Sequence, residues 1–156
     1  LNSYCEGIGG CDKDSPQVSW LKDDLEKNNG LCTVAFWKHP RFSNGIRGDD
    51  KRYSPFWDEL YKAGVEIVLN GSDHNYERFP RLNPNGSIDP LAGIRAFVVG
   101  TGGRSLGERN PKRMSRIFNN NTYGVLQLTL YLEGYDWRFV PIEGQTFTDR
   151  GSGTCR

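Results

Sequence analysis

Two short segments hold most of the side chains of this sequence that could do chemistry. Lys-His-Pro at 38–40 and Ser-Asp-His-Asn at 72–75 contain both histidines of the chain, each just after an apolar run. Imidazole and carboxylate groups bind divalent metals, and imidazole also exchanges protons near neutral pH. The ammonium of Lys38 has no lone pair and favours an anion instead. The two segments therefore predict a metal site or an anion site made by loops.

The apolar runs before these segments are expected to be strands. Leu31–Trp37 is apolar, β-branched and aromatic, and we predict a strand buried on both faces there, followed by a second buried strand at Val65–Leu69. A helix is expected from Ser15 and Pro16, which suit the N-cap and the first helical position. A second helix is expected over Phe56–Ala63. Alternating helices and strands predict an α/β fold.

The second half of the chain has a different pattern. Residues 81–93 read as a loop, 94–99 as a strand ending in Gly-Thr-Gly-Gly, and 104–121 as a polar loop whose basic residues are solvated. Residues 123–132 and 135–142 alternate between apolar and polar positions, which predicts a C-terminal antiparallel hairpin. We therefore expect one domain over residues 1–156: a mixed sheet with two main helices and this hairpin.

The loops that follow strands are expected to form the site, because ligands of open α/β sheets bind at the carboxyl ends of strands. Four loops qualify, at residues 5–14, 38–50, 71–78 and 100–103, and Leu1–Tyr4 reads as the end of the strand before the first. Both histidines fall in these loops.

Composition sets the class of protein and its compartment. The chain has 156 residues, a net charge of +1 and no apolar run of membrane-spanning length, so no nucleic-acid or membrane partner is expected. It starts at Leu1 without a signal peptide, which is expected of a chain matured by cleavage or cut from a longer one. An even number of cysteines favours disulfides and a secreted, extracellular or periplasmic location.

The cysteines are expected to pair in sequence order. Cys5 and Cys11 flank one loop at the carboxyl end of a strand, whereas Cys32 starts the next strand at the opposite end of the sheet. An intervening helix of about ten residues spans ~15 Å, more than a disulfide tolerates. We therefore predict Cys5–Cys11 and Cys32–Cys155.

Four segments in order carry a resemblance to a known family. They are Ser-Pro-Gln…Trp-Leu at 15–21, Trp-Lys-His-Pro-Arg-Phe-Ser at 37–43, Leu-Asn-Gly-Ser-Asp-His-Asn-Tyr-Glu-Arg-Phe at 69–79 and Val-Gly-Thr-Gly-Gly at 99–103. Together they resemble the second half of a calcineurin-like metallophosphoesterase, in the secreted branch related to purple acid phosphatases. The resemblance implies half of a βαβ sandwich, two metals, and hydrolysis of phosphate esters by a metal-bound hydroxide.

The ligand positions implied by the resemblance are substituted. The first histidine of a His-x-Pro motif corresponds to Lys38, with His39 in the x place, and the first histidine of a Gly-His-x-His motif corresponds to Ser72. His74 is the ligand that remains, and the family's other motifs lie before the start of this chain. The resemblance thus implies at most one divalent metal, at His74 with help from Asp73. The alternative, which we favour, is that His74 hydrogen-bonds neighbouring backbone instead of a metal.

Several roles stay open for the remaining site residues. Lys38 is expected to form an ion pair with Asp12, Asp14 or Asp73 that replaces the charge of a metal. The alternative is a phosphate or other anion bound by four basic side chains of the site face, where Asn75 also lies: Lys38, His39, Arg41 and Arg78.

Structural roles are expected for the residues that follow His74. The ring of Tyr76 is expected to pack in the interior, and the carboxylate of Glu77 to pair with the guanidinium of Arg78.

Two functions follow from these substitutions. The first is a degenerate, non-catalytic domain that serves as a secreted binding, structural or self-assembling module. In this case a second copy or a partner chain covers an apolar sheet face that a half-sandwich leaves open. The second is a C-terminal fragment of an active phosphoesterase that needs its missing N-terminal half.

Overall fold

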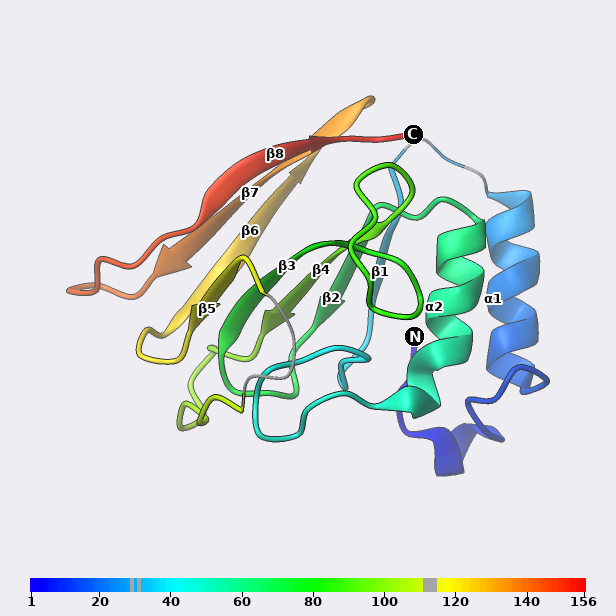
Figure 1. Cartoon of the computed structure of the whole chain (residues 1–156), viewed down its shortest axis with the longest axis horizontal. Coiled ribbons are helices and arrows are strands. Elements are labelled where there is room, and N and C mark those ends of the chain that lie inside the picture. The colour runs from blue at the N-terminus through cyan, green and yellow to red at the C-terminus, as the bar shows by residue number, and fades with distance from the viewer. Residues whose placement is uncertain (29, 31, 111–114) are drawn as a thin grey trace.

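The computed structural model describes residues 1–28, 30, 32–110 and 115–156, and Figure 1 shows them in three layers. Two helices lie on one side, a five-stranded sheet forms the middle, and a three-stranded sheet lies on the other side. The elements are η1 (Cys5–Ile8), α1 (Pro16–Lys27), β1 (Val34–Phe36), η2 (Lys51–Tyr53), α2 (Ser54–Lys62), β2 (Ile67–Asn70), β3 (Tyr76–Leu82), β4 (Ile94–Val99), β5 (Ile117–Asn119), β6 (Gly124–Leu130), β7 (Gly134–Pro141) and β8 (Arg150–Thr154).

α1 begins where the sequence predicts, and α2 begins at Ser54, two residues before its expected start at Phe56. The Ser15 side chain accepts a hydrogen bond from the Val18 amide at 3.4 Å, and Pro16 occupies the first helical position of α1. α2 carries Pro55 in its first turn and buries an apolar face that includes Trp57. The two predicted helices are therefore confirmed.

The sheets combine parallel and antiparallel pairs. The five-stranded sheet has the order β1-β2-β4-β3-β5, in which β1, β2 and β4 are parallel and β3 runs antiparallel to β4 and β5. The second sheet, β6-β7-β8, is antiparallel throughout and contains the predicted hairpin. The mixed α/β architecture is confirmed, and the parallel strands bring the carboxyl ends of β1, β2 and β4 to one end of the molecule.

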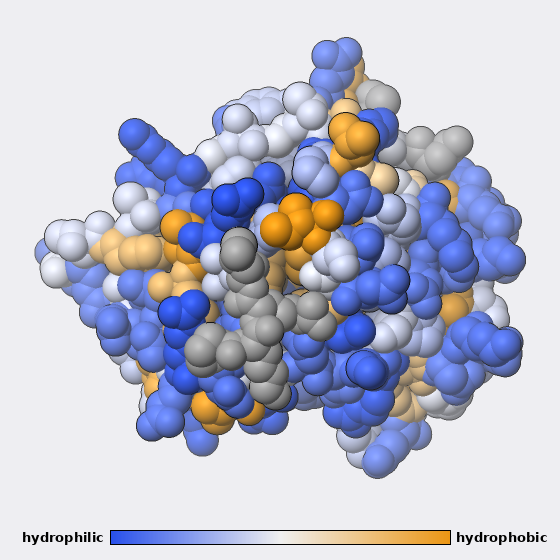
Figure 2. All heavy atoms as spheres, in the orientation of Figure 1, coloured by the Kyte–Doolittle hydropathy of each residue, from blue (hydrophilic) through white to orange (hydrophobic). Residues whose placement is uncertain are grey.

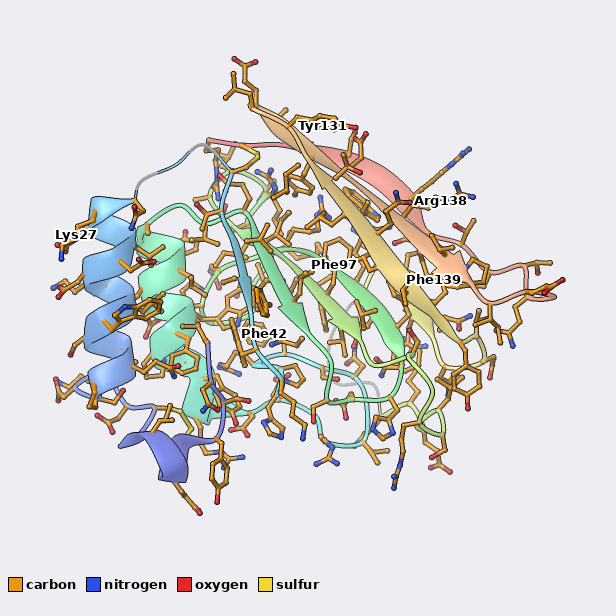
Figure 3. The ribbon with its side chains drawn as sticks, turned by 180° about the vertical axis from the view of Figure 1, so that it is seen from behind. Lys27, Phe42, Phe97, Tyr131, Arg138 and Phe139 are labelled. Carbon is orange, nitrogen blue, oxygen red and sulfur yellow. A yellow bond between two sulfur atoms is a disulfide. The ribbon has the colours of Figure 1, made fainter. Side chains whose placement is uncertain are left out.

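Two apolar cores hold the layers together. The first joins the helices to the five-stranded sheet and includes Phe42, Trp57 and Val68. The second lies between the sheets, where Phe97 of one sheet packs with Trp137 and Phe139 of the other (Figure 3). Each face of the larger sheet thus carries apolar residues that are packed against a neighbouring layer.

β1 differs from its prediction. It has three residues, lies at the edge of the sheet with β2 as its one strand partner, and leaves Phe36 66% exposed. The prediction of a strand buried on both faces was wrong, because an apolar run does not distinguish an edge from a centre. Leu31, where that run begins, lies outside the described residues. Leu1–Tyr4 is not a strand either, and its amino terminus donates to the Phe36 carbonyl at 2.9 Å.

Three strands were not predicted: β3, β5 and β8. β3 contains Pro80, which argues against a central strand because proline cannot donate to the ladder. The structure accommodates Pro80 at a register shift between Arg78 and Arg81, so the strand continues through an irregularity. Lys112 and Arg113, expected in a solvated loop, lie outside the described residues.

Both predicted disulfides are present. Cys5 pairs with Cys11 and Cys32 with Cys155. Disulfides of this kind persist in oxidising compartments, which is consistent with the expected extracellular location. None of the helices described has the length and apolar character needed to cross a membrane.

Candidate functional site

The loops after β1, β2 and β4 meet, as the sequence predicts. The Lys38 carbonyl oxygen accepts hydrogen bonds from the backbone amides of Gly71 and Ser72 at 3.0 and 2.9 Å. The Gly100 amide donates to the Asn75 carbonyl at 2.9 Å, and a Cβ at Gly100 would lie 1.9 Å from the backbone oxygen of Asp73. The loops are therefore joined by main-chain bonds and by a close approach that only glycine allows.

Asp73 is buried at the centre of this cluster, where its carboxylate organises a neighbouring loop. The Ser43 hydroxyl and the Arg47 backbone amide donate to its two oxygens, the latter at 3.1 Å. A Cβ at Gly45 would come within 3 Å of the same carboxylate. Because its oxygens are used in this way, Asp73 supports the loop and is poorly available as a metal ligand.

The two histidines have different environments. His74 Nδ1 donates to the Ser105 carbonyl at 2.9 Å, which leaves its Nε2 lone pair free. His39 Nδ1 lies 2.9 Å from the Ser3 hydroxyl, and its ring stacks on Tyr53. Burial, together with the charge of Lys38, lowers the pKa of His39. His74 is thus held by a backbone carbonyl, whereas His39 is held by the N-terminal segment.

Lys38 is exposed and is not in an ion pair within the described part of the chain. Of the expected partners, Asp14 lies 4.0 Å from Lys13, and Asp73 is bound to the loop at residues 43–47. The predicted ion pair was therefore wrong. An exposed ammonium can be hydrated, which costs less than desolvating it beside a buried carboxylate.

Tyr76, Glu77 and Arg78 take partners far away in the sequence. Arg78 Nε and Nη2 donate to the Asp149 carboxylate at 2.7 and 3.0 Å, and the Tyr76 hydroxyl donates to it at 2.6 Å. The Tyr76 ring packs against Phe139, as predicted. The predicted Glu77–Arg78 pair was wrong, because neighbouring residues of a strand point to opposite faces.

Glu77 is instead bound by Asn44. The backbone amide and the side-chain amide of Asn44 donate to its two oxygens at 2.9 and 2.5 Å, and the carboxylate is fully buried. Burial raises the pKa of Glu77 to about 7, a trend that the Asn44 bonds oppose and the charge of Asp73 reinforces. The sequence gives no signal for this contact between residues 33 positions apart.

Asn75 and Arg41 differ in the hydrogen-bond partners of their side chains. The Asn75 side chain is buried, and among the described residues neither its nitrogen nor its oxygen has a hydrogen-bond partner. Arg41 donates to Ser54 at 2.9 Å and stacks on Phe42. Arg78 is bound to Asp149, so its positive charge is already balanced, and the anion site made by Lys38, His39, Arg41 and Arg78 stays a prediction.

The residues present do not fit a two-metal centre. Ser72 is a weak ligand for a transition metal, and Lys38 brings positive charge to a ligand position. His74 offers one imidazole nitrogen, whereas a catalytic zinc uses three protein ligands. Over residues 1–28, 30, 32–110 and 115–156, no three His, Cys, Asp or Glu side chains are grouped so that they could hold a metal ion.

No protein-family model matches the chain, but individual proteins do. Purple acid phosphatase 18 of Arabidopsis thaliana is 32% identical over 141 residues, which are 83% of this chain and 31% of that protein. The chain therefore spans about a third of the length of this curated relative.

Solved structures share the fold. A purple acid phosphatase from yellow lupin (Lupinus luteus) seeds superposes with a TM-score of 0.78 at 19% identity, over 90% of this chain and 28% of that one. GAP50, described as the anchor in the inner membrane complex of Plasmodium, superposes with a TM-score of 0.73 at 18% identity, over 96% of this chain and 47% of that one. Sequence and fold together make this chain a partial-length homologue of the purple acid phosphatases, within the calcineurin-like metallophosphoesterases.

Proposed function

We propose that this chain is a secreted, non-hydrolytic metallophosphoesterase-like domain that binds a second copy of itself through the edge of β6. The observation that carries the proposal is the use of the site residues. Asp73 is bonded to the loop at residues 43–47, one nitrogen of His74 is held by Ser105, and Lys38 is exposed at the groove described next. Asp73 and His74 thus support loops, which is consistent with a fold retained after hydrolysis was lost.

The binding surface is an apolar groove beside the site loops. It has a volume of about 430 Å³, and its walls include Phe36 of β1, Leu69 of β2 and Val125 of β6. Phe36 and Val125 are both more than half exposed. Figure 2, in the orientation of Figure 1, shows a mainly hydrophilic surface with separate apolar patches. An exposed apolar groove of this kind favours association.

β6 is the edge strand with the least protection against pairing. Its seven residues, Gly124–Leu130, include no charged residue and no proline, and it borders the three-stranded sheet. The other edges, β1, β5 and β8, are shorter, and β8 starts with Arg150. Along the outer side of β6, Gly124 is bonded to Thr101, and within the described chain no further backbone bond follows up to Leu130.

Pairing between two β6 strands gives hydrogen-bond partners to the backbone groups along this edge. Two antiparallel copies would extend the sheet across a two-fold axis, which is the commonest symmetry of homodimers. Because β6 is uncharged, the pairing sets no like charges opposite one another. Added strands of this type bind through main-chain hydrogen bonds, with side chains filling adjacent apolar grooves. GAP50 provides a case in which the same fold belongs to a protein described as an anchor.

Lysine substitution at the edge tests the binding surface. We expect multi-angle light scattering at micromolar concentrations to give a dimer for the unchanged chain and a monomer for Val125→Lys, because a charged edge resists strand pairing. Leu91→Lys is the matched control, since Leu91 is 84% exposed in a loop and lies outside the groove. A monomeric unchanged chain, or a Val125→Lys variant that remains dimeric, contradicts self-association through β6.

The alternative function is a fragment of a metal-dependent phosphoesterase. It is favoured by the coverage of the relatives, since this chain spans 31% of purple acid phosphatase 18. In that case an N-terminal half supplied by another chain would complete the metal site, and the pair would cleave a chromogenic phosphate ester.

Calorimetric titration with Zn²⁺ and Mn²⁺ tests the non-hydrolytic function. For the unchanged chain we expect at most one weak site, lost in His74→Ala. For the double variant Lys38→His and Ser72→His we expect at least about tenfold tighter binding, because imidazoles replace a cation and a hydroxyl. Two tightly bound metals in the unchanged chain, or cleavage of the ester by it, would rule out the non-hydrolytic function.

A further inference from the structure

A second cavity lies at the other end of the sheet from the site loops. Its volume is about 610 Å³, and it opens where β3 ends, β4 begins and β8 ends. Because β4 runs parallel to β2, the start of β4 is far from the carboxyl ends that carry Lys38 and His74. Its wall includes polar side chains from several segments: Arg81, Arg95, Arg116, Glu133, Ser152 and Thr154.

Two of the arginines face each other directly. Arg81 of β3 and Arg95 of β4 are register partners in the antiparallel ladder. Like charges at directly opposed positions destabilise a sheet. Neither guanidinium is in an ion pair within the described part of the chain, and each donates to a backbone carbonyl, Arg81 to Thr154 at 3.1 Å and Arg95 to Phe79 at 3.3 Å. The pair therefore lacks a compensating negative charge.

Arg95 is the more buried member of the pair. Its guanidinium carbon lies 5.3 Å from the centre of the Trp137 ring, and its Nε is buried without a hydrogen-bond partner among the described residues. Burial lowers the pKa of Arg95, the nearby Tyr135 opposes this shift, and the charges of Arg78 and Arg81 reinforce it. Arg78, on the same strand as Arg81, has its positive charge balanced by Asp149.

The remaining wall adds positive charge and hydrogen-bonding groups. Arg116 is exposed at the cavity and Glu133 is the one acidic residue of its lining, so three arginines face one carboxylate. Ser152 and Thr154 add hydroxyl groups from β8. Arginine forks match the planes of oxygen atoms presented by phosphate and sulfate groups.

We propose that this cavity binds a tetrahedral oxyanion, the phosphate or sulfate group of a small molecule, between Arg81, Arg95 and Arg116. The anion neutralises the opposed pair on β3 and β4 and accepts the unused donors of the arginines. A bare ion fills only part of a volume of about 610 Å³, so the cavity also accommodates the organic group of a monoester. This site is independent of the metal-ligand positions and of the β6 edge.

Calorimetry in a low-chloride buffer tests the site. The probes are inorganic phosphate, inorganic sulfate and glucose 6-phosphate, and we expect a dissociation constant of about 1 mM or tighter for at least one of them. Arg81→Gln and Arg116→Gln should each weaken binding about tenfold or more, since each removes a charge-assisted hydrogen bond. Tighter binding of the sugar phosphate than of the free ions identifies a site for the ester, and equal binding identifies a site for the oxyanion alone.

Three controls keep the test specific. Arg138→Gln removes an exposed arginine of β7 that lies outside the cavity and is labelled in Figure 3, so binding should not change. Lys38→Gln should likewise have no effect. Melting temperatures show whether the Arg81 and Arg116 variants remain folded, and phosphate should raise that of the unchanged chain. The proposal is overturned by no binding, by equal binding to the Arg81 and Arg116 variants, or by a loss confined to Lys38→Gln.

Discussion

Replacing Cys32 and Cys155 with serine should lower the free energy of unfolding by about 5 kcal/mol. The bond joins residues 123 positions apart, from the segment before β1 to the end of the chain. A cross-link that closes so long a loop removes much conformational freedom from the unfolded chain. Urea denaturation followed by tryptophan fluorescence gives the loss, since Trp137 lies in the core beside this disulfide.

The other disulfide is the matched control. Cys5 and Cys11 are 6 positions apart, and the same chain-entropy relation gives a loss of about 2 kcal/mol when both are replaced with serine. The comparison holds the chemistry of the substitution constant and changes the loop length. Equal losses for the two pairs would show that loop closure is not the main source of stabilisation.

Replacing Asp149 with alanine should cost about 3 to 5 kcal/mol, because it leaves a buried guanidinium without its counter-charge. Asp149 is 7% exposed and accepts hydrogen bonds from Tyr76, Arg78 and Trp137. It thereby joins β3 of one sheet to the chain just before β8 of the other. Asp136→Ala, at an exposed position of β7, is the control and should cost less than about 1 kcal/mol.

A double-mutant cycle distinguishes the ion pair from general packing. Arg78→Met removes the charge while keeping an apolar stem, and the double variant with Asp149→Ala should be more stable than the sum of the single losses predicts. Additive losses would contradict a coupled pair.

The stability that Asp149 contributes should be lost at acid pH. Burial disfavours the Asp149 carboxylate, but the bonds from Arg78 and Tyr76 hold its pKa below the usual value. Its stabilising contribution is therefore present above about pH 4 and is lost as the pH falls through the lowered pKa of the folded state. The Asp149→Ala variant should lack this part of the acid transition.

Local signals in the sequence predicted the elements that depend on near neighbours. Ser15 and Pro16 fixed the start of α1, alternation marked β6 and β7, and the positions of the cysteines in the elements gave both disulfides. The start of α1 and the alternation of β6 and β7 depend on residues that are close in the sequence. The disulfides could be assigned because the helix between Cys11 and Cys32 is longer than a disulfide can span.

The elements that were missed depend on distant partners. β3 passes through Pro80 because β4 and β5 hold it on both sides, and β8 exists because β7 offers an edge to a short Gly-rich segment. The partners of Glu77 and Arg78 are 33 and 71 positions away. Spacing could place Lys38, Ser72 and His74 in adjacent loops, but it could not show that Asp73 would be bound by Ser43.

The bonds between the Lys38 carbonyl oxygen and the amides of Gly71 and Ser72 have an evolutionary consequence. Main-chain atoms are the same in every amino acid except proline, so this junction survives a change of side chain at either position. In the proposed non-hydrolytic domain, hydrolysis is lost by exchange of a histidine for lysine or serine while the scaffold persists. Substitutions at Lys38 and Ser72 therefore leave the main-chain hydrogen bonds between the two loops intact. The reverse exchanges, to histidine, would place the new side chains on the same loops.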